Sequence, residues 1–151
     1  MTEQLEEYIK LISSPTEESI GSLLEKLLEH FSAERGCLWS GAEGSVVYRG
    51  NEELKMSYPF SRRIVLAAVK TRLGFLSFDL KSDDRIEATE SIKATNIRSC
   101  LCAPARRGDG KVLSVIYFDD NTSRGVFTEE DLEFIVELMS HYPGATRHAA
   151  E

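Results

Sequence analysis

The sequence predicts an α+β fold, in which a central antiparallel sheet of five or six strands carries helices on one face. Short segments of strand composition are joined by glycine-containing turns, and residues 107–110 (Arg-Gly-Asp-Gly) are the clearest hairpin signal among them. Apolar residues at helical spacing lie before the first of these segments and after the last. We therefore expect one domain over residues 1–151, with a helical extension at 1–13, a core at 14–142 and a tail at 143–151.

Two amphipathic helices are expected before the first strand. The first has apolar residues three and four positions apart: Leu5, Tyr8, Ile9 and Ile12. The second is predicted to have Ser14 as its N-cap, Pro15 at its first helical position and Glu17 as the closing residue of a capping box. Its apolar residues form one stripe between Ile20 and Phe31, which is typical of a helix that packs on a sheet.

The middle of the chain alternates strand, turn and helix signals. Strands are predicted from β-branched and aromatic content, and a helix from the spacing of apolar residues. The predicted strands are residues 36–40, 45–49, 75–78 and, weakly, 54–58; the predicted helix is 61–72; and residues 84–95 form either a marginal helix or an irregular loop.

The C-terminal third reads as a hairpin followed by a helix. Its first strand, residues 97–104, is expected to end at Pro104, because proline cannot donate to a sheet ladder. Its second strand, residues 112–118, is β-branched and aromatic, and the polar residues 119–121 are expected to stop it. Thr128 is the predicted N-cap of the last helix, whose first turn is acidic.

This succession resembles a GAF domain. The residues that carry the resemblance are 97–99 (Ile-Arg-Ser), 102–104 (Cys-Ala-Pro), 111–119 (KVLSVIYFD) and 127–132 (FTEEDL), with further likeness at 33–38, 61–76 and 82–85. GAF domains are sensory modules of phosphodiesterases, phytochromes and bacterial transcription regulators, and the resemblance is nearest to the N-terminal sensor domains of bacterial enhancer-binding transcriptional activators. It implies terminal helices on one face of the sheet and, on the other, a lid formed by residues 79–97.

The charge and composition of the chain argue against several classes of partner. Its formal net charge of −7 disfavours direct nucleic-acid binding, which requires a positive face against the phosphates. No apolar run reaches the roughly 18 residues that a membrane span needs, and the N-terminus does not read as a signal peptide. Three cysteines at irregular spacing fit reduced thiols, so we expect a cytoplasmic location.

The resemblance implies a small-molecule pocket between the lid and the sheet. An apolar sheet face below a loop with ionisable groups can bind and orient a small polar ligand. The ligand is unknown. The candidate ligand-binding residues are Trp39, Phe78, Asp79, Asp84, Arg85, Arg98, Cys100, Phe118 and Asp119. A solvated surface loop and ordinary core packing of the aromatic residues are the alternatives.

No grouping of residues predicts catalysis, a metal or a cofactor. Cys100 and Cys102 lie two apart on a predicted strand, so they share a face, either as small buried hydrophobes or as part of a redox or metal site with Cys37. Methionine sulfoxide reductases of similar fold use loop cysteines instead. The pattern of the cyclic-nucleotide-binding members is incomplete, since Thr122 stands where they have lysine and Leu132 where they have glutamate. The cysteine–histidine pair of bilin-binding members is absent.

The last helix carries two apolar stripes, and the second one needs a partner. The N-terminal segment of the same chain is one possible partner, and a second copy in a symmetric homodimer is the other. The candidate dimer-interface residues are Leu5, Tyr8, Ile9, Phe134, Leu138 and Tyr142. We therefore expect a non-enzymatic regulatory sensor that acts on an effector domain or partner protein. A ligand-free interaction module is the alternative, and a cysteine-based redox or metal sensor is a third.

Overall fold

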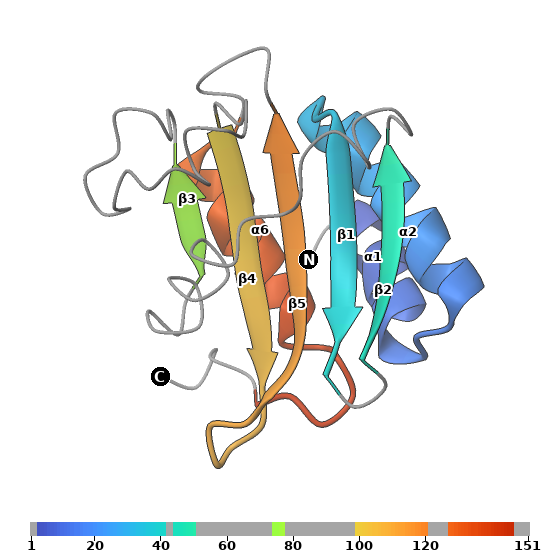
Figure 1. The fold of residues 1–151 in the computed structure, drawn as a ribbon, viewed down its shortest axis with the longest axis vertical. Coiled ribbons are helices and arrows are strands. Elements are labelled where there is room, and N and C mark those ends of the chain that lie inside the picture. The colour runs from blue at the N-terminus through green and yellow to red at the C-terminus, as the bar shows by residue number, and fades with distance from the viewer. Residues whose placement is uncertain (1–2, 42–43, 51–73, 78–98, 121–126, 147–151) are drawn as a thin grey trace.

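The computed structural model of the chain describes residues 3–41, 44–50, 74–77, 99–120 and 127–146 (Figure 1). The weak strand predicted at 54–58, the helix at 61–72 and the helix or loop at 84–95 lie outside the described residues. No helix within the described ranges has both the length and the apolar character that a membrane crossing requires.

Among the described residues, five strands form one antiparallel sheet in the order β2-β1-β5-β4-β3. Their bounds are β1 Arg35–Ser40, β2 Ser45–Gly50, β3 Phe75–Ser77, β4 Ser99–Arg106 and β5 Val112–Asp120. Strands that are consecutive in the sequence form the β1–β2, β3–β4 and β4–β5 pairs, and β1 joins β5 across the centre. The predicted α+β class and the number of strands are confirmed.

The helices of the described segments lie on one face of this sheet: α1 Glu3–Ser13, α2 Glu17–Phe31 and α6 Glu129–Met139 (Figure 1). The apolar stripe predicted on α2 faces the sheet, and its residues Leu23, Leu24 and Leu27 are fully buried. From the sheet side, Leu38, Ile116 and Leu101 pack against the helices in the same cluster. The hydrophobic core therefore lies between the helical layer and this face of the sheet.

The cap of α2 corrects the prediction that placed it at Ser14. The N-cap is Thr16, whose hydroxyl accepts a hydrogen bond from the backbone N–H of Ser19 at 3.0 Å, while the Ser19 hydroxyl accepts one from the N–H of Thr16 at 2.8 Å. Because α1 extends to Ser13, Ser14 and Pro15 form the connection between the two helices. Ser14 with Glu17 matched the usual capping-box pattern, but serine supplies the second partner here.

The cap of α6 is Thr128, as predicted, and Asp131 closes the capping box. The Thr128 hydroxyl accepts from the N–H of Asp131 at 3.1 Å, and the Asp131 carboxylate accepts from the N–H of Thr128 at 2.9 Å. Asp131, one residue of the incomplete cyclic-nucleotide pattern, therefore serves as a helix cap.

Two strand ends differ from the prediction. β4 continues through Pro104 to Arg106, and Pro104 pairs with Val115 of β5. On its other side β4 pairs with β3 only at residues 100–102, so the missing N–H of Pro104 interrupts no ladder among the described strands. β5 includes Asp119 and Asp120. Both aspartates are buried, so here they are part of the sheet and do not end it.

Candidate functional site

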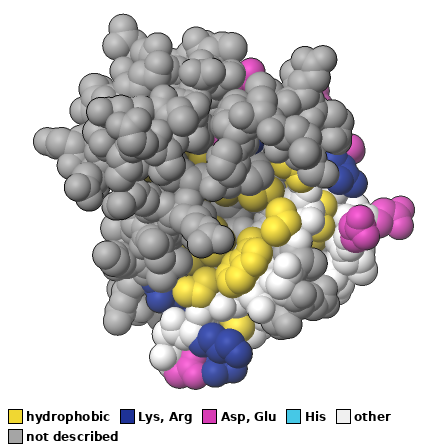
Figure 2. All heavy atoms as spheres, in the orientation of Figure 1, with side chains coloured by type: hydrophobic (Ala, Val, Ile, Leu, Met, Phe, Trp, Pro, Cys, Tyr) yellow, Lys and Arg dark blue, Asp and Glu magenta, His cyan; other side chains and the backbone are white. Residues whose placement is uncertain are grey.

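The sheet face opposite α1, α2 and α6 carries the chemically distinctive residues, and we call it the non-helical face. Side chains alternate between faces along a strand, and directly paired residues share a face. The strand pairing therefore places on this face Arg35, Cys37 and Trp39 of β1, Val115, Tyr117 and Asp119 of β5, Cys100, Cys102 and Pro104 of β4, Val46 and Tyr48 of β2, and Phe75 and Ser77 of β3. Figure 2, viewed from this side, shows a diagonal band of hydrophobic side chains across the sheet, with the described charged side chains at its margins.

A buried ion pair joins the two central strands on this face. Arg35 of β1 lies directly opposite Asp119 of β5. The Arg35 Nε donates to Asp119 Oδ1 at 2.7 Å, and Nη2 donates to Oδ2 at 2.9 Å. The Tyr117 hydroxyl donates to Oδ2 at 2.7 Å. Neither charged side chain has any solvent exposure, so the two-pronged contact provides each charge with the partner that burial requires.

Burial controls the protonation of this network. Burial raises the pKa of the Asp119 carboxyl. The hydrogen bonds from Arg35 and Tyr117 lower this pKa, but the effect of burial is larger. Burial, and then the negative charge of Asp119, raise the pKa of the Tyr117 hydroxyl well above its ordinary value. Tyr117 is therefore a permanent hydrogen-bond donor at neutral pH, and it holds the carboxylate in place against Arg35.

The three cysteines all lie on this face, and all are buried as reduced thiols. Cys37 and Cys102 stand on either side of Tyr117 in one row across the sheet. Burial is the main cause that raises the pKa of both thiols well above the ordinary value. The negative charge of Asp119 raises the pKa of Cys37 further, and the neighbouring Cys100 raises that of Cys102. Both thiols are protonated at neutral pH and shielded from solvent, which is typical of inert structural cysteines. No group of three metal-ligating side chains occurs in the described part of the chain.

The ion pair continues into a polar row that crosses four strands. Asp119 lies opposite Cys100, and Cys100 lies opposite Ser77 of β3. Ser77 is fully buried, yet its hydroxyl oxygen has no hydrogen-bond partner among the residues that the structure describes. A buried hydroxyl without a partner costs about 1–3 kcal/mol, so Ser77 offers an unused donor and acceptor on this face.

An exposed apolar pair lies at the other end of the face. Trp39 is 38% exposed, and Val46, directly opposite it on β2, is 54% exposed. Val115 flanks Trp39 on β5 and is buried. The face thus passes from a buried polar row near the start of β1 to an exposed apolar pair near its end.

The structure brings together three of the predicted ligand-binding residues and separates a fourth from them. Trp39, Cys100 and Asp119 share the non-helical face. Phe118 was wrongly predicted to line the pocket, because it is fully buried on the helical face. Its ring packs edge-on against that of Phe31 of α2, with the ring centroids 5.2 Å apart. The other predicted ligand-binding residues lie outside the described residues: Phe78, Asp79, Asp84, Arg85 and Arg98.

The sequence analysis missed three residues of this site: Arg35, Tyr117 and Ser77. A usable signal was the period of two, because Arg35 lies two residues before Cys37 and Tyr117 two before Asp119. Arg35 had been placed just before its strand, although β1 begins with it.

The residues predicted to form a dimer interface pack largely within one chain. Tyr8 is 3% exposed and Leu138 is fully buried, so neither lies on the surface of a single copy. The Tyr8 ring packs edge-on against the ring of Phe134, with the ring centroids 5.8 Å apart. Leu5, Ile9, Phe134 and Tyr142 are partly buried against the core. The N-terminal helix therefore contacts Phe134, a residue of the second apolar stripe of α6, within the single chain.

Comparisons with known proteins agree with the architecture. A sequence model described as the GAF domain matches residues 15–142. No curated protein sequence matches the chain. A similar solved structure is the GAF domain of an Acinetobacter phosphoenolpyruvate-protein phosphotransferase, which is 15% identical, with 93% of this chain and 91% of that one covered at a TM-score of 0.62.

Two further solved structures show how widely this fold is used. The free methionine-R-sulfoxide reductase of Neisseria meningitidis, solved with its substrate, is 18% identical over 91% of this chain and 82% of that one, with a TM-score of 0.63. The GAF domain of the cyanobacteriochrome TePixJ is 16% identical over 86% and 89%, with a TM-score of 0.61. At these identities the likeness concerns the fold. The sequence model, in contrast, matches most of the chain. This protein therefore belongs to the GAF domain family, whose members are mostly regulatory.

Proposed function

We propose that the chain is a regulatory sensor domain that binds a small ligand on the non-helical face of its sheet, beneath a lid at residues 79–97. The observation that carries this proposal is the buried polar row from Arg35 to Ser77, whose last hydroxyl has no hydrogen-bond partner in the described part of the chain. A ligand with a hydrogen-bonding group at this end of the face would satisfy Ser77.

In this proposal the signal leaves through the terminal helices. A bound ligand favours one position of the lid and thereby changes how α1 and α6 contact a second copy or an effector. Since Tyr8 and Leu138 are buried within the chain, a homodimer would use the partly buried residues Leu5, Ile9 and Phe134 instead. We further propose a cytoplasmic bacterial setting in transcription regulation, on the sequence resemblance to sensor domains of enhancer-binding activators.

Native mass spectrometry of the purified protein, paired with the denatured mass, tests ligand binding first. A fixed mass increment in the native spectrum that is absent from the denatured one supports a non-covalent ligand. Tyr117→Phe removes one hydroxyl from the polar network and is expected to reduce the ligand-bound fraction. Tyr8→Phe makes the same change on the helical side of the molecule, at the junction of α1 and α6, and is the matched control. No increment, and no ligand-dependent change in the fluorescence of Trp39, the single tryptophan of the chain, would contradict the proposal.

The second candidate is an interaction module without a ligand. It is favoured by the burial of Cys37, Cys102 and Tyr117, which leaves little of the polar part of this face open. In that case the native mass is that of the bare chain or an exact multiple of it. Substitutions on α1 and α6 then change binding to the partner, whereas Tyr117→Phe changes only stability.

An enzymatic role through cysteine is the third possibility. The burial of all three thiols and the raised pKa of Cys37 and Cys102 count against a thiolate nucleophile. We therefore propose a non-enzymatic role and test it through thiol reactivity, as described in the Discussion.

A further inference from the structure

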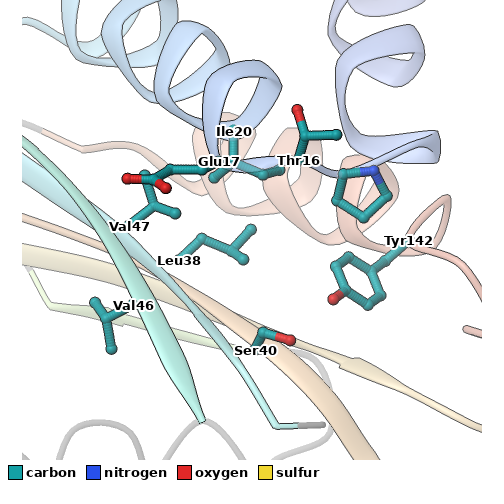
Figure 3. Close-up of a pocket in the computed structure, with 9 residues that line it drawn as sticks. Thr16, Glu17, Ile20, Leu38, Ser40, Val46, Val47 and Tyr142 are labelled. Carbon is teal, nitrogen blue, oxygen red and sulfur yellow. The ribbon is translucent and has the colours of Figure 1, made fainter. Parts of the chain in front are cut away.

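A cavity lies on the helical side of the molecule, between α2 and the sheet. It has a volume of about 460 Å³ and opens between the first turn of α2, strands β1 and β2, and Tyr142 beyond the end of α6 (Figure 3). This volume falls within the range of small-molecule sites in proteins, about 300–1,000 Å³. The cavity is therefore large enough for a ligand of modest size.

The lining of this cavity combines aliphatic and polar residues. Ile20 of α2 with Leu38 and Val47 of the sheet contribute aliphatic surface. Figure 3 shows the Tyr142 ring at one end, the Ser40 hydroxyl close to it, and the Glu17 carboxylate at the opposite end above Val47. An elongated ligand would thus meet an aromatic ring at one end and a carboxylate at the other.

Glu17 is the charged group among the described residues that line this cavity. Its carboxylate makes no ion pair or hydrogen bond with the part of the chain that the structure describes, unlike Glu25 on the same helix, which pairs with Arg49. The Glu17 carboxylate is therefore free to accept a cationic partner.

The start of a helix ordinarily attracts anions, but α2 is arranged differently. The reciprocal bonds between Thr16 and Ser19 already occupy two of its N-terminal N–H groups. Glu17 and Glu18 add two negative charges in the first turn. The local charge therefore favours a cation over a phosphate or carboxylate.

We propose that this cavity binds a small organic amine, with its ammonium group at Glu17 and its apolar body on Ile20, Leu38 and Val47. The amine hydrogen-bonds to the carboxylate, and an aromatic or branched aliphatic body replaces water above the aliphatic floor. A ligand in this position contacts α2, the sheet and the segment after α6 at once. It would therefore stabilise the packing of α2 and of the segment after α6 against the sheet, independently of any ligand on the non-helical face.

Titration with phenethylamine and with 2-phenylethanol, a neutral analogue of nearly the same shape, tests the proposal. We expect saturable binding of the amine, measured by calorimetry and by amide shifts in NMR spectra at Ile20, Leu38 and Val47. The alcohol is expected to bind about tenfold more weakly, since a hydrogen bond to a charged group is lost.

Glu17→Gln should remove this preference for the amine. Glu18→Gln is the matched control, because it removes the same charge from the same helical turn at an exposed residue outside the described lining of the cavity. Equal binding of amine and alcohol, equal loss in both variants, absence of saturation, or amide shifts centred on Arg35 and Asp119 would each overturn the proposal. The last outcome would place the amine on the non-helical face and leave the proposed sensor function standing.

Discussion

Arg35 and Asp119 are separated by 84 positions in the chain, yet they lie directly opposite each other on neighbouring strands and pair without contact with solvent. The pair links β1, from the N-terminal half, to β5, from the C-terminal hairpin. We expect Asp119→Asn to lower the free energy of unfolding by about 3–5 kcal/mol, because it leaves a buried guanidinium without a compensating charge. Urea denaturation followed by circular dichroism measures this change.

Two comparisons separate the charge effect from the loss of a single hydrogen bond. Tyr117→Phe removes one hydrogen bond to the same carboxylate and should cost about 1 kcal/mol. The double variant Arg35→Met with Asp119→Leu replaces both charges by apolar groups and should be more stable than Asp119→Asn. If the double variant is less stable than Asp119→Asn, packing at these positions outweighs the unpaired charge, contrary to our reading.

The three thiols should not react in the folded protein. Cys37, Cys100 and Cys102 are buried, and burial raises the pKa of Cys37 and Cys102. We expect Ellman's reagent at about pH 8 to label none of them within minutes in native buffer and all three in denaturant. Fast labelling of one cysteine in the native protein would identify an accessible, low-pKa thiol and reopen the enzymatic possibility.

Thr16, rather than Ser14, should control the stability of the start of α2. Thr16→Ala removes the capping hydroxyl and is expected to cost about 1 kcal/mol. Ser14→Ala is the control; only the backbone carbonyl of Ser14, which the variant retains, accepts a bond from Ser19. Thermal denaturation of the two variants decides between them, and an equal loss in both would contradict the observed cap.

Tyr8 should act as a core residue of the single chain. Tyr8→Ala is expected to lower the free energy of unfolding by about 3 kcal/mol, because it removes a buried ring from the junction with Phe134. Ile9→Ala, at a partly buried neighbour, should cost less. The measurement combines urea denaturation with light scattering. A change in oligomeric state without a loss of stability would show that Tyr8 contacts a partner instead.

The tip of the β4–β5 hairpin has its own pH dependence. Hydrogen bonds from Arg107, and then from the N–H of Lys111, lower the pKa of Asp109 to about 2. A lowered pKa in the folded state means that this contribution to stability is present above the ordinary carboxyl pKa and is lost as the pH falls through about 2. NMR titration of the Asp109 carboxyl should give that midpoint, and Arg107→Ala should move it toward 3.8. An unchanged midpoint in the variant would assign the shift to the turn backbone.

Local patterns predicted the class of fold and most element positions because each strand and helix carries its own signal. The hairpin glycines, the Thr128 cap and the apolar stripe of α2 are such signals. The faces were harder to predict. Phe118 and Asp119 are adjacent and were assigned to one pocket, although alternation along β5 places them on opposite sides of the sheet.

The pairing of Arg35 with Asp119 could not be predicted because it depends on long-range strand order. Nothing local in the sequence shows that β1 pairs with β5, because the two strands are neighbours in the sheet but far apart in the chain. Ser14 and Thr16 posed a different difficulty. Both satisfy the local rules for an N-cap, and the end of α1 at Ser13 decides between them.

The ion pair between Arg35 and Asp119 also helps to fix the register of the two central strands. A strand that pairs one residue out of register turns every side chain to the opposite face. If β5 slipped by one position, Asp119 and Tyr117 would enter the apolar layer beneath the helices, while Ile116 and Phe118 would face Arg35. Such a misaligned sheet would bury an unpaired charge on each side. The pair thus disfavours the neighbouring registers of the central strands, so that one alignment of the described sheet is favoured over the others.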